Sequence, residues 1–294
     1  MTDNDFVLVG IKPIKLPETI NPPWWRGRPL FSAAILALII LGCIFANSIM
    51  TKDPTFMDLL NYSKAPNSEF LFGTDTLGRD IFSMIWYGGR ISLFIGVVAT
   101  LISTTIAVIF GSISGLAPDW LDTLMMRLTE IFLSVPTLLV VVILQAILGK
   151  ANTVSISIVI GVTSWMSIAK VIRTEVRQIR NSEYVIASGC MGGGFFHILR
   201  KHLAPNFVSS IMFMVVMNIR TAIVSESTLS FMGIGLPLEI ISWGSMLSLS
   251  EKALLSGSWH VILVPGVFLT VTLMCITNIG NYLRSEVNRK ESNM

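Results

Sequence analysis

The sequence predicts an all-α, polytopic membrane protein with six transmembrane helices. Of its 294 residues, 52% are hydrophobic and only 13% are charged, and the mean hydropathy is +0.71. This balance is unusual for a soluble domain of that size and ordinary for a chain that lies mostly in a bilayer. Apolar runs of about 20 residues, the length that crosses the hydrocarbon core, recur along the whole chain after residue 29.

The apolar runs define the domain organisation. We expect the first run to be retained as a helix, because no small-residue cleavage pattern follows it before Lys52. An N-terminal segment then occupies 1–29, a transmembrane domain occupies 30–283, and a tail occupies 284–294. The predicted spans are 30–50, 91–116, 124–148, 154–172, 207–224 and 261–283.

The distribution of lysine and arginine predicts the orientation. Basic residues gather before the first span, between the fourth and fifth spans, and after the sixth, which all fall on one side of a six-span chain. Loops rich in Lys and Arg stay in the cytoplasm. We therefore expect a multi-pass protein of the plasma membrane with both termini cytoplasmic and with external segments at 51–90 and 226–260. The basic residues that decide this are Lys12, Lys15, Arg26, Arg28, Arg173, Arg177, Arg180, Arg200, Lys201, Arg284, Arg289 and Lys290.

The segment 173–206 is too long and too basic to be a simple connector. Glu183 suits the first turn of a short helix, where the helix dipole favours an acidic side chain. Gly192 and the two glycines after it are expected to end that helix and turn the chain. A second helical stretch over 195–203 should then stop before Pro205. Two short helices at an angle would form a compact knob that fits a groove on a cytoplasmic partner.

A second interpretation of the same segment stays open. An amphipathic connector lying on the headgroups, with its basic residues against anionic lipid, would have the same composition.

The sequence predicts no catalytic, metal-binding or cofactor-binding residues in this chain. The glycines at 192–194 are not a phosphate loop, because no Lys-Ser or Lys-Thr follows them, and no Walker A pattern occurs elsewhere. His197 and His202 lack a third metal ligand. The three cysteines lie far apart and suggest neither disulfides nor a zinc site: Cys43, Cys190 and Cys275. No nucleic-acid partner is expected.

Several motifs together carry a resemblance to a known family. The stretch 183–206, EYVIASGCMGGGFFHILRKHLAPN, resembles the signature loop of ABC importer permeases, with Ala187, Gly192 and Pro205 at the Ala, Gly and Pro positions. Ile186, Ser188 and Ala204 depart from that pattern. The stretches 73–96 (GTDTLGRDIFSMIWYGGRISLFIG), 121–128 (LDTLMMRL), 226–235 (ESTLSFMGIG) and 242–244 (SWG) are similar to the second, C-type permease of dipeptide, oligopeptide and nickel importers.

The resemblance implies a function and a set of partners. It implies the transmembrane subunit of an ATP-driven importer that forms a translocation path with a homologous second permease. Two cytoplasmic ATPase subunits, which use ATP and magnesium, and an extracytoplasmic solute-binding protein would complete the complex. The substrates it suggests are di- or oligopeptides, nickel, or a metal chelate. The residues it places in coupling to the ATPases are Glu183, Tyr184, Ala187, Gly192, Arg200 and Pro205.

Arg220 is the clearest charge inside a predicted span. An unpaired charge at that depth costs at least about 2.5 kcal/mol, so Arg220 should face protein or water. It either snorkels or pairs with Glu226, or it faces the translocation path and attracts a substrate carboxylate. Asn218, Arg220 and Glu226 are therefore the candidate path residues.

Two other function classes remain to be weighed. A secondary transporter or channel would work without ATPase partners, but such proteins usually place ionisable residues in several spans. An intramembrane enzyme would need a catalytic cluster at membrane depth.

Overall fold

The computed structural model describes residues 29–249, 253 and 257–291, and it is helical as the sequence predicts. The N-terminal segment predicted at 1–29 lies outside the described residues except for Pro29. Within the described part the β-type pairing is a single bridge between Thr74 and Asp80. In chain order the helical elements are α1 (Leu30–Ile44), α2 (Ala46–Ile49), the 3-10 turn η1 (Leu59–Asn61), α3 (Ile81–Leu116), α4 (Asp119–Ser134), α5 (Thr137–Leu148), α6 (Thr153–Thr163), α7 (Met166–Ile179), α8 (Glu183–Cys190), α9 (Phe195–Ile198), the π-helical turn η2 (Leu199–Leu203), α10 (Ala204–Phe231), α11 (Trp243–Ser248) and α13 (His260–Glu291).

The apolar helices correspond to the predicted spans, but not one to one. Within the described residues, α3, α10 and α13 are each long and apolar enough to cross a membrane, and the bent pairs α4–α5 and α6–α7 bring the number to 5 if each pair is one span. The first predicted span is the shorter helix α1, with 15 residues, followed by α2. The six-span prediction therefore holds as six apolar segments, of which α1 is below the usual spanning length.

The second and sixth spans are longer than predicted. Helix α3 begins at Ile81 rather than at 91, because the side chain of Asp80 accepts a hydrogen bond from the Ser83 amide and caps the helix. The last ten residues of the predicted external segment 51–90 therefore belong to helix α3. Helix α13 continues to Glu291, so most of the predicted tail is helical and continuous with the sixth span.

The fifth span is also longer, and Pro205 does not break it. The turn η2 continues directly into α10, with Pro205 in the first turn, where a helix needs no amide donor. Helix α10 ends at Phe231, so the segment predicted as external from 226 begins inside a helix. Glu226 is part of that helix.

The third and fourth spans are bent. Helices α4 and α5 meet at 89° across Val135 and Pro136, and α6 and α7 meet at 44° across Ser164 and Trp165. Pro136 lacks an amide proton and holds Val135 in an extended conformation, which ends α4. The segment predicted as a loop from 173 begins as helix, because α7 continues to Ile179.

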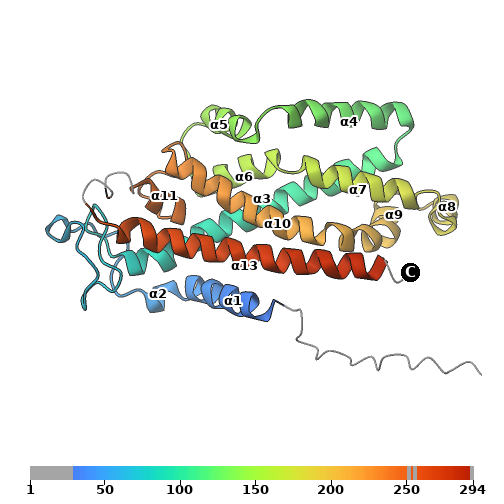
Figure 1. The fold of residues 1–294 in the computed structure, drawn as a ribbon. Coiled ribbons are helices and arrows are strands. Elements are labelled where there is room, and N and C mark those ends of the chain that lie inside the picture. The colour runs from blue at the N-terminus through green and yellow to red at the C-terminus, as the bar shows by residue number, and fades with distance from the viewer. Residues whose placement is uncertain (1–28, 250–252, 254–256, 292–294) are drawn as a thin grey trace, which may run out of the picture.

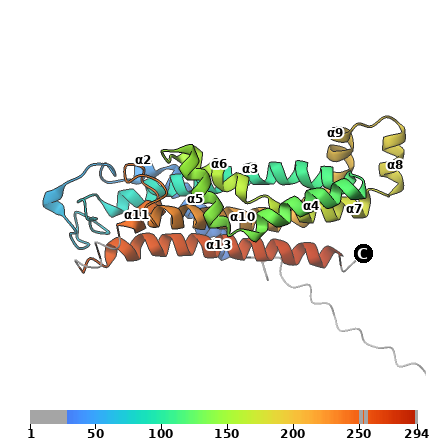
Figure 2. The same cartoon turned by 90° about the horizontal axis from the view of Figure 1, so that it is seen from above.

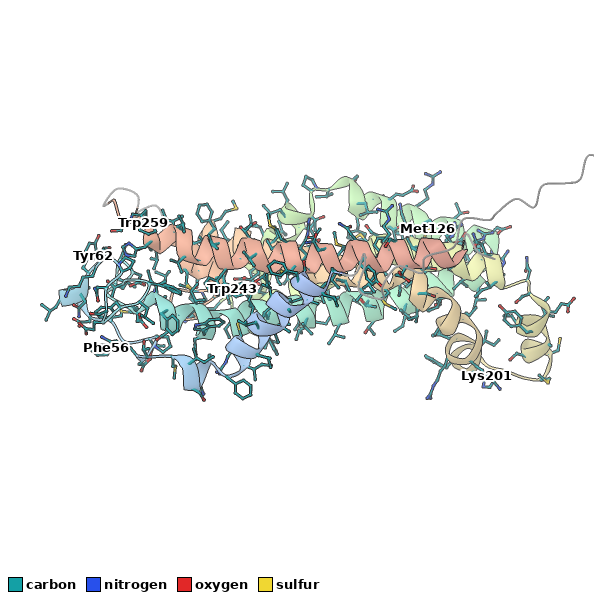
Figure 3. All side chains as sticks on the ribbon, turned by 60° about the horizontal axis from the view of Figure 1, so that its bottom comes forward. Phe56, Tyr62, Met126, Lys201, Trp243 and Trp259 are labelled. Atoms are coloured by element: carbon teal, nitrogen blue, oxygen red, sulfur yellow. The ribbon has the colours of Figure 1, made fainter. Side chains whose placement is uncertain are left out.

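Helix α3 runs through the middle of the bundle, with α6, α7 and α10 packed on it (Figures 1 and 2). The pairing of α3 with α7 is close, because a Cβ atom on Gly115 would lie 2.6 Å from the Val176 side chain. Helices α8 and α9 lie at one end of the bundle, and the segment between α2 and α3 lies at the other (Figure 1). In Figure 3, Lys201 marks the first end, and Phe56, Tyr62 and Trp259 mark the second.

The segment between α2 and α3 is folded tightly. The Arg79 guanidinium donates to the Asp75 carboxylate at 2.8 Å, and both side chains are 3% exposed. Arg79 also donates to the carbonyl of Leu238, at 3.3 Å, which joins this segment to the one that follows α10. Asp75 and Arg79 therefore hold this segment by a buried ion pair, whereas Asp80 acts as a helix cap.

Candidate functional site

The knob predicted from the sequence, residues 183–205, projects from the end of the bundle (Figures 1 and 2). Gly192 has φ +84°, the left-handed conformation that glycine adopts without strain. Helix α8 lies before this turn, and α9 with η2 lies after it, over the residues 195–203 expected for the second stretch.

The surface of the knob is exposed and largely apolar. Met191 is 82% exposed and Phe196 is 75% exposed, and Tyr184 and Ile186 are about half exposed. Nonpolar side chains gathered on a projecting element mark a surface that binds another protein or lipid. The predicted coupling residues Glu183, Tyr184, Ala187 and Arg200 are exposed, Gly192 forms the turn, and Pro205 opens α10.

An ion-pair network, which we name the brace, ties α4 to α7 just before the knob. Asp122 is buried in α4 and accepts hydrogen bonds from the guanidinium groups of Arg173 and Arg177 on α7. The Arg173 Nε bond to Asp122 is 2.9 Å long, and the Ser114 hydroxyl adds another of 2.6 Å. Arg177 also donates to Asp119, at 2.6 Å. Bonds between a carboxylate and guanidinium groups are among the strong ones in proteins.

The brace is important for the position of α4, because few residues of α4 are buried against the rest of the bundle. Among the residues of α4, only Asp122 and Thr129 are buried. Helix α7 ends at Ile179, four residues before α8 begins, so the same arginines sit at the base of the knob. The brace therefore connects α4 to the helix that leads into the knob.

The brace residues were not predicted as a site. Arg173 and Arg177 are four residues apart and so share a helix face, which signals a common acidic partner. The sequence did not say which acidic residue that partner is.

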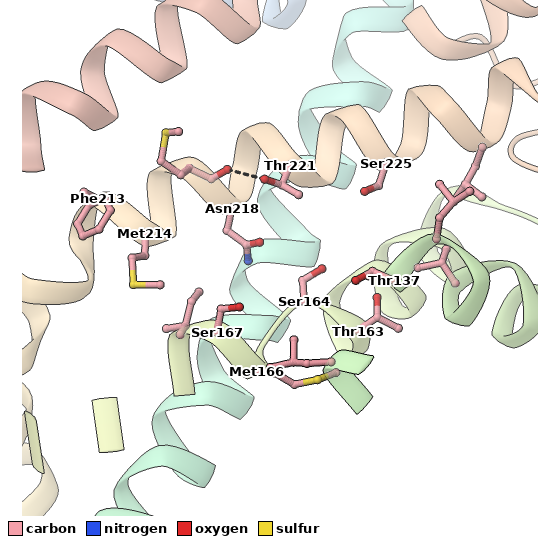
Figure 4. A pocket seen from close by; sticks show the side chains of 16 residues that line it. Thr137, Thr163, Ser164, Met166, Ser167, Phe213, Met214, Asn218, Thr221 and Ser225 are labelled. Carbon is pink, nitrogen blue, oxygen red and sulfur yellow. Dashed lines mark hydrogen bonds between the residues drawn. The ribbon is translucent and has the colours of Figure 1, made fainter. Parts of the chain in front are cut away.

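A cavity of about 480 Å³ opens where the two bent pairs face α10 (Figure 4). The α4–α5 bend contributes Leu133 and Thr137, and the α6–α7 bend contributes Ser164. Its volume lies in the range of small-molecule sites in proteins. The lining residues carry no ionisable side chain: Leu133, Thr137, Leu138, Val141, Thr163, Ser164, Met166, Ser167, Ile168, Phe213, Met214, Met217, Asn218, Thr221, Ser225 and Leu229.

The three candidate path residues do not come together. Asn218 lines this cavity and donates to Ser103 of α3. Arg220 lies in a different cavity, of about 450 Å³, beside α13, where its Nη1 approaches the Thr277 hydroxyl at 3.4 Å. Its Nε atom is buried and has no hydrogen-bond partner among the described residues.

Glu226 lines neither of these two cavities. Its side chain is fully buried and accepts hydrogen bonds from Ser242 at 2.7 Å, Ser230 at 2.9 Å and Ser92 at 3.2 Å. These bonds fasten the start of α11 to α10 and α3. Pairing of Arg220 with Glu226, one of the alternatives from the sequence, is not found, because the carboxylate is surrounded by serine hydroxyls.

Comparison with known proteins shows the family to which this arrangement belongs. Residues 107–289 match the family described as "Binding-protein-dependent transport system inner membrane component". The chain belongs to this family. It is 40% identical over 256 residues to the oligopeptide transport system permease protein OppC of Bacillus subtilis (strain 168), covering 87% of this chain and 83% of the relative. It is 35% identical over 271 residues to the dipeptide transport system permease protein DppC of the same organism, covering 90% and 84%.

The same similarity extends to another organism. The oligopeptide transport system permease protein OppC of Haemophilus influenzae is 35% identical over 268 residues, covering 88% of this chain and 85% of the relative. The resemblance that the motifs indicated is therefore confirmed. This permease is a multi-pass protein of the inner membrane, its family is a transport family rather than an enzyme family, and membership implies ATPase and solute-binding partners.

Proposed function

We propose that this permease is the transmembrane subunit of an ATP-driven importer of di- or oligopeptides. A homologous second permease would complete the path, and two ATPase subunits would bind ATP and magnesium. The observation that carries the proposal is the continuous connection from the exposed knob, through α7 and the brace at Asp122, to the wall of the cavity. The names of the related oligopeptide and dipeptide permeases support the substrate class.

In this proposal, movement of the knob changes the shape of the cavity. The ATPase subunits hold the exposed apolar surface of α8 and α9 and displace it as they close. Because the brace joins α7 to α4, both bent pairs move with the knob, and the cavity opens alternately to each side. Rigid movement of helices about bends is a common way for a transport path to open first to one side of the membrane and then to the other.

The proposed orientation places the knob and both termini in the cytoplasm. The basic residues near the knob support it by the positive-inside rule. The solute-binding protein would then dock at the opposite end of the bundle, which carries the folded segment between α2 and α3 and helix α11 (Figure 1).

Peptides suit the cavity better than bare nickel does. Nickel sites are typically built from imidazole, thiolate or carboxylate groups. The lining side chains are hydrocarbon, hydroxyl, thioether and amide groups. For the same reason a substrate carboxylate has no cationic partner in this cavity, and Arg220 would act beside α13 rather than in the path.

The test is purification of the tagged permease from its own membranes, followed by reconstitution with its partners. We expect the second permease and both ATPase subunits to copurify, and the proteoliposomes to take up peptide only with ATP and loaded binding protein. Met191→Glu, on the exposed knob, should reduce recovery of the ATPases. Leu60→Glu is the matched control, because Leu60 is 92% exposed at the other end of the bundle. Uptake without ATP, or a complex without ATPases, would favour a secondary transporter or channel.

A further inference from the structure

We propose that the cavity facing α10 binds the main chain of a peptide through hydrogen-bond acceptors that receive its N–H groups. This inference rests on the proposed function and adds a site, a ligand chemistry and named residues. The site is the polar face formed by Thr163, Ser164, Asn218 and Thr221 (Figure 4).

The polar residues of α10 lie along one line in the cavity wall. Asn218, Thr221 and Ser225 are three and four residues apart, which places them on one face of the helix. At about 1.5 Å per residue, the line from Asn218 to Ser225 is about 10 Å long. An extended peptide advances about 3.3 Å per residue, so the line matches roughly three peptide residues.

The hydroxyl groups in this wall have already donated their protons. Thr221 donates to the Met217 carbonyl at 3.1 Å, as Figure 4 shows, and Ser164 donates to the Ile160 carbonyl at 2.7 Å. Thr163 donates to the Val159 carbonyl at 3.0 Å. A hydroxyl has one proton and two lone pairs, so each of these groups is left as an acceptor.

The side-chain amide of Asn218 is likewise left with an acceptor oxygen. Ser103 donates its proton to the Thr100 carbonyl at 3.2 Å, so its oxygen must accept from the Asn218 Nδ2 group at 2.5 Å. With Nδ2 directed to Ser103, the amide oxygen of Asn218 remains as an acceptor. A row of acceptors without a charged group selects a ligand that offers N–H donors, which a peptide main chain does at every residue except proline.

The apolar part of the wall explains how different side chains fit. Three methionines line the cavity, Met166, Met214 and Met217. Methionine side chains are flexible and polarizable, and they adapt to partners of different shape. Main-chain recognition on α10, together with adaptable thioethers, would admit peptides of varied sequence.

The test uses the reconstituted complex and two tripeptides, Ala-Ala-Ala and its analogue methylated at the central amide nitrogen. Thr221→Val replaces the acceptor by a methyl group of the same shape. We expect uptake of the unmodified peptide to fall about fivefold, the usual effect of one hydrogen bond, and uptake of the methylated peptide to change less. The matched control is Thr228→Val. Thr228 lies on the same helix and donates to the Val224 carbonyl at 2.8 Å, but it is outside the cavity wall.

The outcomes separate this inference from the proposed function. If the wild-type complex carries no peptide, the proposed function fails. If the wild type carries peptide and Thr221→Val carries both peptides as the wild type does, or loses both equally, the main-chain site is refuted. If the wild type carries the methylated peptide too slowly to measure, the unmodified rates of the two valine variants decide. Should Thr221→Val not assemble, Ser164→Ala is measured in the same way and its result decides.

Discussion

Replacing Asp122 by asparagine should separate ATP hydrolysis from transport. The substitution keeps the shape of the side chain and removes the charge that faces Arg173 and Arg177. Removing one partner of a buried ion pair costs about 3 to 5 kcal/mol. The two arginine side chains are 28% and 30% exposed, so water compensates part of the loss and we expect about 3 kcal/mol. At 1.4 kcal/mol per factor of ten, the docking of α4 on α7 should weaken roughly a hundredfold.

The assay is the number of peptides imported per ATP hydrolysed in the reconstituted complex. We expect this ratio to fall in Asp122→Asn, because the knob still follows the ATPases while α4 no longer follows α7. Spin labels on α4 and α7 should show a broader distribution of distances in the same variant. A charge-conserving Asp122→Glu should restore part of the ratio.

The matched control is Glu130→Gln, which removes the same charge from the same helix. Glu130 pairs with Arg127 at 3.0 Å, and their side chains are 49% and 74% exposed. Such exposed pairs contribute about 0 to 1 kcal/mol, so the control should import normally. A wild-type ratio in Asp122→Asn, with an unchanged α4–α7 distance, would refute the role of the brace.

Three further predictions follow from the geometry. Gly192→Val should lose coupled transport while still inserting, because valine at φ +84° costs about 1 to 2 kcal/mol, and normal coupled turnover would contradict the knob assignment. A thiol reagent that does not cross membranes should label a Ser68→Cys variant in intact cells, whereas Cys190, the exposed native cysteine among the described residues, should react only in opened cells. External labelling of both would invalidate the orientation. Arg220→Gln should import peptide at the wild-type rate if the path runs on the other side of α10, and a selective loss of uptake in an assembled complex would return Arg220 to the path.

The sequence by itself determined the features that depend on local chemistry. Long apolar runs define the membrane segments because each must satisfy its backbone within itself as a helix. The turn at Gly192 and the helices on either side of it were predicted because glycine adopts the left-handed conformation there at no cost. The prediction that the second helical stretch stops before Pro205 was wrong, because a proline in the first turn of a helix does not interrupt it.

Helical periodicity alone separates two of the candidate path residues. Asn218 and Arg220 are two residues apart, so at about 100° per residue they point to nearly opposite sides of α10. Only the packing of α10 between the bent pairs and α13 decided which of these sides lines the larger cavity.

Tertiary structure alone decided the bends and the long-range contacts. The third span was predicted as one run, 124–148, although Pro136 disfavours a continuous helix there, and the 89° angle depends on what α4 and α5 pack against. Asp122 and Arg173 are 51 residues apart, and Glu226 accepts hydrogen bonds from Ser92 on α3 and from Ser242 at the start of α11. A buried charge requires a partner, and which residue supplies it is set by how the helices pack in space, which local sequence does not specify.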